Sequence, residues 1–388
     1  MKIRVFVDND EADLHAFVIV DSLAQGRAMG GTRMTPGVTP DEVAELARKM
    51  TMKLALAGLD IGGAKAGIVC GLPLGPERDR VLAEFGKAVS PLLHGGLYLG
   101  GDQGVSHRDR DVFFDAAGFD ATLATDSTGL PCSWPELWKK CSDVTGFGVC
   151  EGIDQGVDTL GIRGECRTVA VQGFGCVGSA VAAGLSARGF TVVAVADREG
   201  TVSHPDGLPL EALFAATDSA GTIDRSRLPE GLTLDPTPDA WLDVDADVLV
   251  LAAGGDAITE ANADRVRARI VAEGGNCTCT PGAQRALAAR GVKVLPDIVV
   301  NTGGAAVTAL LLTGEAPAEA MADADTLTAW LYREVGRRIR RSTDRLLEFA
   351  ESSGLQLMDA AAELADRRLA ERETAGTAGG RTTALSLV

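Results

Sequence analysis

The chain lacks features that mark several common classes of protein. Its 388 residues contain 37 Lys and Arg against 54 Asp and Glu, a formal charge of −17, which argues against a nucleic-acid backbone or an anionic membrane as partner. No apolar run approaches the roughly 20 residues that a bilayer requires. The early charges of MKIRVFVDND do not fit a signal peptide. We therefore expect a cytoplasmic protein with a small-molecule ligand.

Metal-binding patterns of cysteine and histidine are also absent. The sequence has only four histidines, and its eight cysteines form no CxxC pair. Cys277 and Cys279 are close together, but no second Cys or His cluster supports them as zinc ligands. We expect reduced structural thiols and no metal.

The amino-terminal and central regions differ in pattern, which indicates an α/β fold with two domains. At 388 residues, 46% of them hydrophobic, the chain is long enough for two separate cores. Residues 1–135 mix strand-like runs with a helix and glycine-rich stretches. Residues 150–300 alternate apolar strands with helices, which is typical of a parallel sheet covered on both faces. The strands of this second region are predicted at 168–172, 191–196, 248–251, 270–272 and 292–295.

The remaining segments carry weaker signals. Residues 204–245 are rich in Pro, Asp and Gly, and the sequence assigns this excursion no function. Residues 324–372 are charged and rich in Ala and Leu, which predicts helix. The tail, residues 374–388, is predicted to be disordered.

Two lysines in an apolar, glycine-rich stretch form the first candidate site. Residues 40–57 begin with a helix-start pattern, and Lys53 falls on the apolar face of that helix. Lys65 is surrounded by glycine and alanine, so a small molecule could approach it closely. An ammonium group directed into a core is costly unless it is paired, which favours a ligand-binding or proton-transfer role. The alternative is that Lys53 reaches to water and Lys65 lies on an exposed loop.

The second candidate site is a dinucleotide-binding signature. A predicted strand ends at Gly173, and Gly173, Gly175 and Gly178 have the GxGxxG spacing before a predicted helix. These glycines would provide a tight turn, close approach of pyrophosphate, and close packing of helix on strand. Asp197 ends the next strand, where it can accept from ribose hydroxyls. The alternative is a glycine-rich turn kept for packing alone.

Seven motifs occur in an order that resembles the glutamate/leucine/phenylalanine/valine dehydrogenases. The resemblance covers roughly residues 15–310 and looks closer to the leucine, valine and phenylalanine branch. It implies a substrate domain (residues 1–135), a Rossmann-type dinucleotide-binding domain (136–320) and carboxy-terminal helices (321–373) that close back over a cleft. The motifs are AMGGTRMTPG, the MTMK and GGAKAG pair, GGDQG, VTGFGV, GFGCVG, VAEGGNCTCTPGA and LPDIVVNTGGAAVT.

The resemblance also implies an activity and a role for particular residues. The reaction is the reversible oxidative deamination of an L-amino acid to a 2-oxo acid and ammonium with a nicotinamide dinucleotide. Lys53 matches the lysine that binds the substrate carboxylate, Lys65 the catalytic lysine, and Asp102 the aspartate that exchanges a proton with the substrate nitrogen. Other positions that the resemblance places at the substrate are Met29, Gly30, Gly31, Gly100, Asn276, Asn301, Ala305 and Thr308. Positions that it places at the cofactor are Thr145, Gly173, Phe174, Gly175, Cys176, Val177, Gly178, Asp197, Arg198, Ala252, Ala253, Asn276 and Asn301.

Departures from the family pattern bear on the substrate. The glutamate branch has a lysine directly before the paired glycines, where this chain has Met29. Gly100 and Ala305 are small and leave room for a bulky side chain, whereas Thr308 fits neither branch clearly. We therefore expect an apolar L-amino acid such as Leu, Val, Phe or Trp.

The acid at the end of the second strand bears on the cofactor. Asp197 favours NAD, because a carboxylate repels a 2′-phosphate, although the adjacent Arg198 could offset that repulsion. By resemblance we also expect a homo-oligomer.

Two other functions stay open at this point. The chain could reduce another 2-oxo acid or an imine in a specialised biosynthetic pathway. It could also be a non-catalytic, dinucleotide-binding regulator, although a regulator has no evident reason to keep Lys53, Lys65 and Asp102 together.

Overall fold

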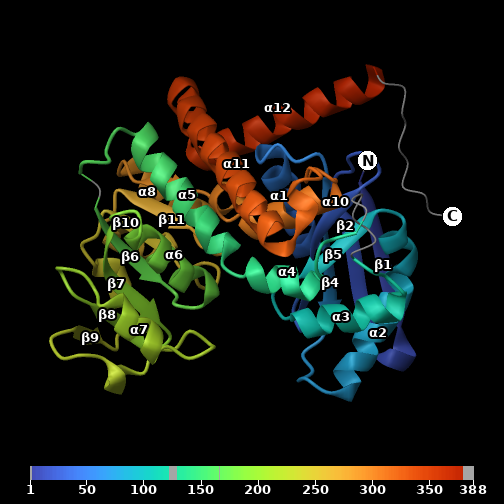
Figure 1. Cartoon of the computed structure of the whole chain (residues 1–388), viewed down its shortest axis with the longest axis horizontal. Helices are drawn as coiled ribbons and strands as arrows, with labels where there is room; N and C mark the ends of the chain where they lie inside the picture. The colour runs from blue at the N-terminus through green and yellow to red at the C-terminus, as the bar shows by residue number, and fades with distance from the viewer. Residues whose placement is uncertain (1, 122–128, 166, 379–388) are drawn as a thin grey trace. The chain divides into compact units, whose positions relative to one another are not determined.

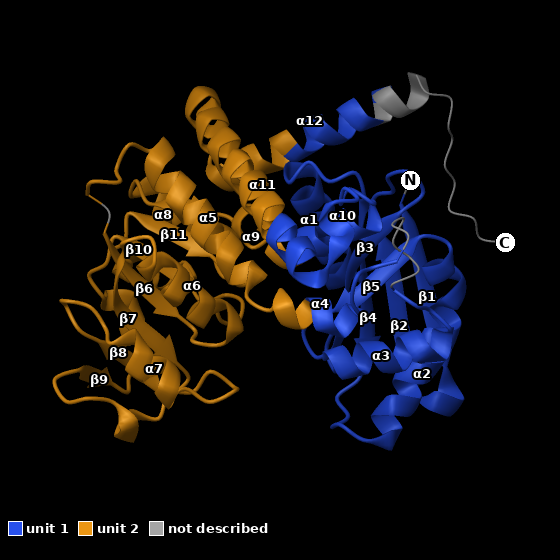
Figure 2. Ribbon diagram, viewed as in Figure 1, with its two compact units in different colours: residues 1–137, 305–331, 365–388 blue, residues 138–304, 332–364 orange. Residues whose placement is uncertain are grey.

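The computed structural model describes residues 2–121, 129–165 and 167–378, and it divides into two compact units (Figure 2). Unit 1 contains residues 1–137, 305–331 and 365–388. Unit 2 contains residues 138–304 and 332–364. Each unit is built on one sheet with helices packed against it, so the expected α/β class with two domains is confirmed.

The sheet of unit 1 has five strands in the order β1-β2-β4-β3-β5. Strand β2 runs antiparallel to β1 and β4, whereas β3 pairs in parallel with β4 and β5. Helix α1 lies on one side of this sheet, and α2 and α3 lie on the other (Figure 1). The strands are β1 (Ile3–Asn9), β2 (Leu14–Val20), β3 (Ala28–Thr35), β4 (Gly62–Val69) and β5 (Leu97–Gly101), and the helices are α1 (Pro40–Leu56), α2 (Pro76–His94) and α3 (His107–Ala117).

Helix α1 forms where the sequence predicts it. The Thr39 hydroxyl accepts a hydrogen bond from the Glu42 N–H, and Pro40 occupies the first turn, where a missing N–H costs nothing. Val43, Ala47 and Leu54 are fully buried. The periodicity of apolar residues thus places one face of α1 in the core.

The glycine-rich stretch around Lys65 is not an exposed loop but the buried central strand β4. Its glycines are there because α1 packs directly on this strand. A Cβ atom at Gly63 would lie 2.2 Å from the Thr51 backbone nitrogen, and one at Gly67 would lie 2.9 Å from a methyl group of Val43. Only glycine leaves room for so close a helix, and α1 carries Lys53 two residues after Thr51.

The sheet of unit 2 has seven strands in the order β12-β11-β10-β6-β7-β8-β9. The five strands from β12 to β7 are parallel, whereas β8 and β9 add antiparallel pairs at one edge. The predicted strands of this region are all present within two residues of the expected bounds. They are β6 (Thr168–Gln172), β7 (Thr191–Asp197), β10 (Val248–Leu251), β11 (Ile270–Glu273) and β12 (Lys293–Leu295), to which β8 (Gly200–Ser203) and β9 (Thr233–Asp235) are added.

Helices of unit 2 cover this parallel sheet (Figure 1). Helix α6 packs on β6 and β7, and α5 packs on α6. Because β7 and β10 flank β6 on opposite sides, the chain reverses its direction of winding at β6, which is where open parallel sheets bind ligands. The helices here are α5 (Val144–Thr159), α6 (Cys176–Ser186), α7 (Leu210–Ala216), α8 (Pro281–Ala289) and α9 (Asp297–Val300).

Four further helices carry the chain between the two units. They are α4 (Trp134–Lys140), α10 (Gly303–Leu312), α11 (Ala324–Ser353) and α12 (Leu357–Ala378). Helix α12 includes residues 374–378, whereas the rest of the expected tail, residues 379–388, lies outside the described residues. Within the described ranges, no helix is both long and apolar enough to cross a membrane.

Candidate active site and dinucleotide-binding turn

Lys65 and Asp102 meet in unit 1, as the resemblance implies. The Lys65 Nζ lies 3.2 Å from Asp102 Oδ2, and 11% of each side chain is exposed. Lys65 comes from the middle of β4, and Asp102 directly follows β5. The strand order places β3 between them, so the side chains meet across that strand.

Lys65 and Asp102 both lie next to Gly31 of β3. A Cβ atom at Gly31 would lie 3.2 Å from the Lys65 Nζ and 3.0 Å from the Asp102 Cβ. A larger residue at this position would therefore press against both functional side chains. At Gly30 a Cβ atom would collide with the Ala64 carbonyl oxygen at 1.7 Å, so this glycine is required for the strands to approach.

A third charged group, Arg33, contacts Asp102. Its Nε donates to Asp102 Oδ2 at 3.2 Å, and the same guanidinium pairs with Glu42 of α1. Burial raises the pKa of Asp102, but the charges of Lys65 and Arg33 and their hydrogen bonds lower it by more. The carboxylate thus stays ionised at neutral pH.

The other substrate residues divide between the two units. In unit 1, Lys53 is 8% exposed on α1, Met29 is 3% exposed on β3, and Gly100 pairs with Gly31 across β3 and β5. Residues Ala305 and Thr308 belong to the part of α10 in this unit, whereas Asn276 and Asn301 belong to unit 2. The Asn301 amide donates to the Gly274 carbonyl and fixes the loop that contains Asn276.

The three glycines of unit 2 form a turn between β6 and α6. Gly173 has φ +90°, a conformation that favours glycine. A Cβ atom at Gly178 would lie 1.8 Å from the Gly173 carbonyl oxygen, whereas one at Gly175 would meet nothing within 4 Å. The turn is therefore tight, its helix is packed closely, and its middle is open to a ligand at the α6 amino terminus.

A cavity of about 670 Å³ lies at this turn, over the carboxyl ends of β6, β7 and β10. Among its lining residues are Gly173, Phe174, Gly175, Asp197, Arg198, Ala252 and Ala253. Thr145 lies elsewhere in the unit, at the start of α5, where a Cβ atom at Gly304 would be 3.3 Å from its hydroxyl. The cavity thus fits the nucleotide end of a dinucleotide.

Asp197 lies at the end of β7 as expected, but its carboxylate already has partners. Two nitrogens of Arg225 donate to its two oxygens at 2.5 Å, and the backbone N–H of Ile223 donates at 2.7 Å. Burial raises the pKa of Asp197, but these hydrogen bonds lower it by more. Only 3% of this side chain is exposed.

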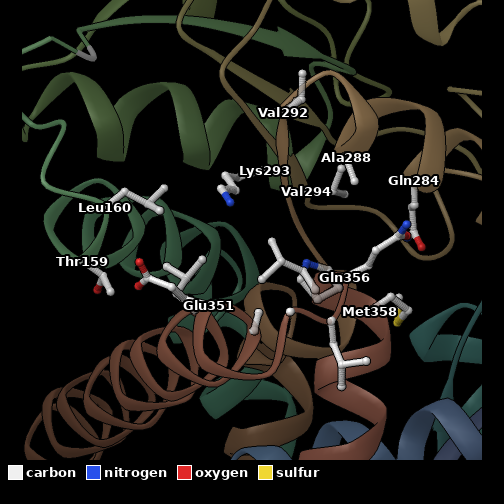
Figure 3. A pocket seen from close by; sticks show the side chains of 17 residues that line it. Thr159, Leu160, Gln284, Ala288, Val292, Lys293, Val294, Glu351, Gln356 and Met358 are labelled. Carbon is white, nitrogen blue, oxygen red and sulfur yellow. The ribbon is translucent and has the colours of Figure 1, made fainter.

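A separate cavity of about 390 Å³ lies at the opposite edge of the unit 2 sheet (Figure 3). Its walls come from β12 and from the ends of α5, α8 and α11, with Lys293, Glu351 and Gln356 among the lining residues. It contains none of the predicted catalytic or cofactor-binding side chains, so we do not place the chemistry there.

The two neighbouring cysteines differ in burial, because Cys279 is buried and Cys277 is only partly buried. Burial raises the pKa of the Cys279 thiol, as does the neighbouring Glu273, so the thiol stays protonated. Across the described ranges, no three His, Cys, Asp or Glu side chains are grouped to hold a metal ion.

Sequence reasoning missed two arginines. Arg33 and Gly31 are two residues apart on β3, so side-chain alternation could have placed Arg33 on the Asp102 side. Arg225 is 28 residues from Asp197 and lies in the excursion 204–245, to which no function could be assigned from the sequence. No local signal predicts that pair.

Comparison with known proteins identifies the family of the chain. The family described as "Glutamate/Leucine/Phenylalanine/Valine dehydrogenase" matches residues 139–376, and "Glu/Leu/Phe/Val dehydrogenase, dimerisation domain" matches residues 1–113. The chain belongs to this family of amino-acid dehydrogenases. The resemblance seen in the seven motifs is thereby confirmed, and an enzyme that uses a nicotinamide dinucleotide is supported.

Relatives of known sequence and structure agree with this assignment. A glutamate dehydrogenase of Thermotoga maritima is 36% identical over 301 residues, which are 74% of this chain and 69% of that protein. An NADP(+)-dependent glutamate dehydrogenase of Pyrobaculum calidifontis is 34% identical over 78% of this chain and 74% of its own length. The hetero-hexameric glutamate dehydrogenase of Thermus thermophilus, in its Leu-bound form, has a TM-score of 0.74 at 27% identity and covers 96% of this chain and 88% of its own.

Proposed function

We propose that this amino-acid dehydrogenase catalyses the reversible, NAD-dependent oxidative deamination of an apolar L-amino acid to its 2-oxo acid and ammonium. The observation that carries the proposal is the contact between the mostly buried Lys65 and Asp102 beside Gly31. A base and an acid in contact can handle water and amine in one site. Lys53 serves as the anchor for the substrate carboxylate.

Lys65 and Asp102 divide the proton transfers between them. As a neutral amine, Lys65 removes a proton from the water that attacks the imine carbon, and in its protonated form it stabilises the carbinolamine oxygen. Asp102 exchanges a proton with the substrate nitrogen, which must be deprotonated before oxidation and protonated before it leaves as ammonia. Arg33 holds the Asp102 carboxylate in place through its hydrogen bond to Oδ2.

The glycine turn of unit 2 would hold the cofactor. Gly173, Gly175 and Gly178 leave the α6 amino terminus accessible to pyrophosphate, and Arg198 lines the same cavity. When bound, the dinucleotide supplies the hydride acceptor for the α-carbon. An acidic side chain at the end of β7, Asp197, supports use of NAD, and its ion pair with Arg225 bears on how strongly NADP is excluded.

Met29 supports an apolar substrate. It is buried on β3 two residues before Gly31, so alternation along the strand directs it to the side of Lys65 and Asp102. The glutamate branch has a lysine at this position, and a methionine offers no partner to a second carboxylate. A buried carboxylate without a partner is strongly disfavoured. Gly100, on the neighbouring strand, has no side chain of its own, and the Tyr98 ring lies 3.2 Å from where its Cβ would be.

Glutamate is the second candidate substrate, because the relatives reported above are named glutamate dehydrogenases. Assays of the candidate substrates one at a time decide between an apolar amino acid and glutamate. Initial rates with L-Leu, L-Val, L-Phe, L-Trp and L-Glu, each with NAD and NADP, should be highest for an apolar amino acid, whereas D-amino acids and 2-hydroxy acids should give none. Glutamate as the best substrate would refute the apolar assignment.

The assembly and location follow from the same reasoning. We propose a homo-oligomer, supported by the dimerisation-domain match to residues 1–113. We also propose a cytoplasmic location, which the acidic composition supports. We assign substrate binding to residues 1–135 and cofactor binding to residues 136–320, and we propose that helices within 321–373 take part in closure on the substrate.

Replacement of Lys53 by Ala should act on substrate binding. A carboxylate anchor holds the substrate and the transition state alike, so the KM for the amino acid should rise at least about tenfold with little change in kcat. Steady-state kinetics at saturating cofactor measure both. Lys87→Ala, at a lysine of α2 that is 61% exposed, is the matched control. A fall in kcat without a change in KM would place Lys53 in the chemical step instead.

A further inference from the structure

The segment 217–225 of unit 2 packs on the glycine-rich turn. A Cβ atom at Gly221 would lie 2.7 Å from both the Cα and the backbone nitrogen of Gly175. Just before this segment, the ring of Phe214 stacks on Phe174 with 5.6 Å between centroids. Ala220, Gly221 and Thr222 line the same cavity as the turn. This segment therefore forms one wall of the nucleotide cavity.

The Asp197 carboxylate, at the end of β7, connects the segment 217–225 to the sheet through hydrogen bonds. It accepts hydrogen bonds from two nitrogens of Arg225, from the Ile223 N–H and from the Glu199 N–H at 2.8 Å. A carboxylate has about four acceptor positions, and these four donors use them all. A ribose 2′-hydroxyl would find no acceptor there unless one donor left.

The Arg225 guanidinium also offsets the negative charge of Asp197. Discrimination against a 2′-phosphate depends on that charge, and an ion pair in contact presents little net field to a third group. Arg198 lines the cavity as a further cation, while Asp239 and Asp256 line it as anions. The usual electrostatic barrier to a 2′-phosphate is thus largely removed at Asp197.

We propose that Arg225 is a specificity-determining residue for the dinucleotide: by occupying Asp197 it weakens the preference for NAD, so that NADP is accepted as well. The proposal deepens the proposed function, since it rests on use of a nicotinamide dinucleotide at this turn. Arg225 acts through Asp197 and is not itself a catalytic residue. Its loss frees acceptor positions for the 2′-hydroxyl and restores the charge that repels a 2′-phosphate.

The test compares Arg225→Ala with Arg227→Ala, an exposed arginine of the same short 3-10 helix. Dissociation constants for NADH and NADPH are measured by nicotinamide fluorescence without amino acid, so the result does not depend on turnover. In the unaltered protein the two constants should lie within about tenfold. Arg225→Ala should widen the ratio in favour of NADH at least tenfold, and Arg227→Ala should leave it unchanged.

Two further variants separate this role from mere support of the loop. Arg225→Lys keeps the charge and should keep the ratio near that of the unaltered protein even if the loop loosens. Adding Asp197→Asn to Arg225→Ala should abolish the widened ratio, because the effect acts through the carboxylate. An unchanged ratio in Arg225→Ala, equal weakening of both cofactors, or a strongly NADH-selective unaltered protein would each overturn the proposal. Failure of the proposed deamination would show separately, as absent turnover with intact cofactor binding.

Discussion

Replacement of Lys65 by Ala is expected to reduce kcat at least about 10²-fold, as loss of a general acid and base does. The side chain lies 3.2 Å from Asp102, next to Gly31, and Asp102 is assigned the separate proton exchange with the substrate nitrogen, so loss of Lys65 removes the group that activates water. The dinucleotide turn belongs to the other unit. NADH affinity, measured by fluorescence, should therefore change little.

Controls for this experiment separate chemistry from folding. Removal of Lys65 also takes a cation from the buried Asp102, which Arg33 still contacts, so the melting temperature must be measured alongside activity. Lys65→Arg keeps the charge but is a poor proton donor and acceptor near neutral pH, so its kcat should stay low. Exposed Lys87→Ala should be unaffected. Near-normal turnover in Lys65→Ala would remove this lysine from the mechanism.

The second large effect concerns the substrate side chain. The unaltered protein should use its best apolar amino acid with a kcat/KM at least about 10² above that for glutamate, because a buried, unpaired carboxylate costs several kcal/mol. Met29→Lys supplies a cation next to the paired glycines. It should raise kcat/KM for glutamate at least about tenfold and lower it for apolar substrates.

Met29→Leu is the matched control, since it preserves volume and polarity and should leave the preference unchanged. If Met29→Lys leaves glutamate turnover unaltered while the protein stays folded, Met29 does not face the substrate side chain. If the unaltered protein already prefers glutamate, another cation meets that carboxylate and the apolar assignment fails.

The sequence pattern correctly predicted the strands of unit 2, the glycine turn and α1, because their apolar or glycine residues recur at regular spacing. The strands of unit 2 are nearly continuous apolar runs, and the GxGxxG spacing implied a tight, open turn that Gly173 and Gly175 indeed form. In the same way, the Thr39 cap and the spacing of apolar residues predicted α1.

Elements that depend on contacts far along the chain could not be predicted in this way. Gly62–Val69 resembles a loop because glycines are frequent in it. Gly63, however, is needed because the Thr51 backbone nitrogen of α1 lies 2.2 Å from where its Cβ would be. Arg225 pairs with Asp197 across 28 residues. Neither the packing of α1 on β4 nor the Arg225–Asp197 pair can be predicted from neighbouring residues in the sequence, since both arise from tertiary packing.

The most direct measurement of the central claim is the balance of products from one amino acid. Purified protein is incubated with the best apolar L-amino acid and NAD, and the 2-oxo acid, ammonium and NADH are each quantified. The account predicts equal amounts of all three, and reversal to the amino acid when 2-oxo acid, ammonium and NADH are supplied together. NADH oxidation by the 2-oxo acid without any need for ammonium, or cofactor binding with no turnover of any amino acid, would contradict it.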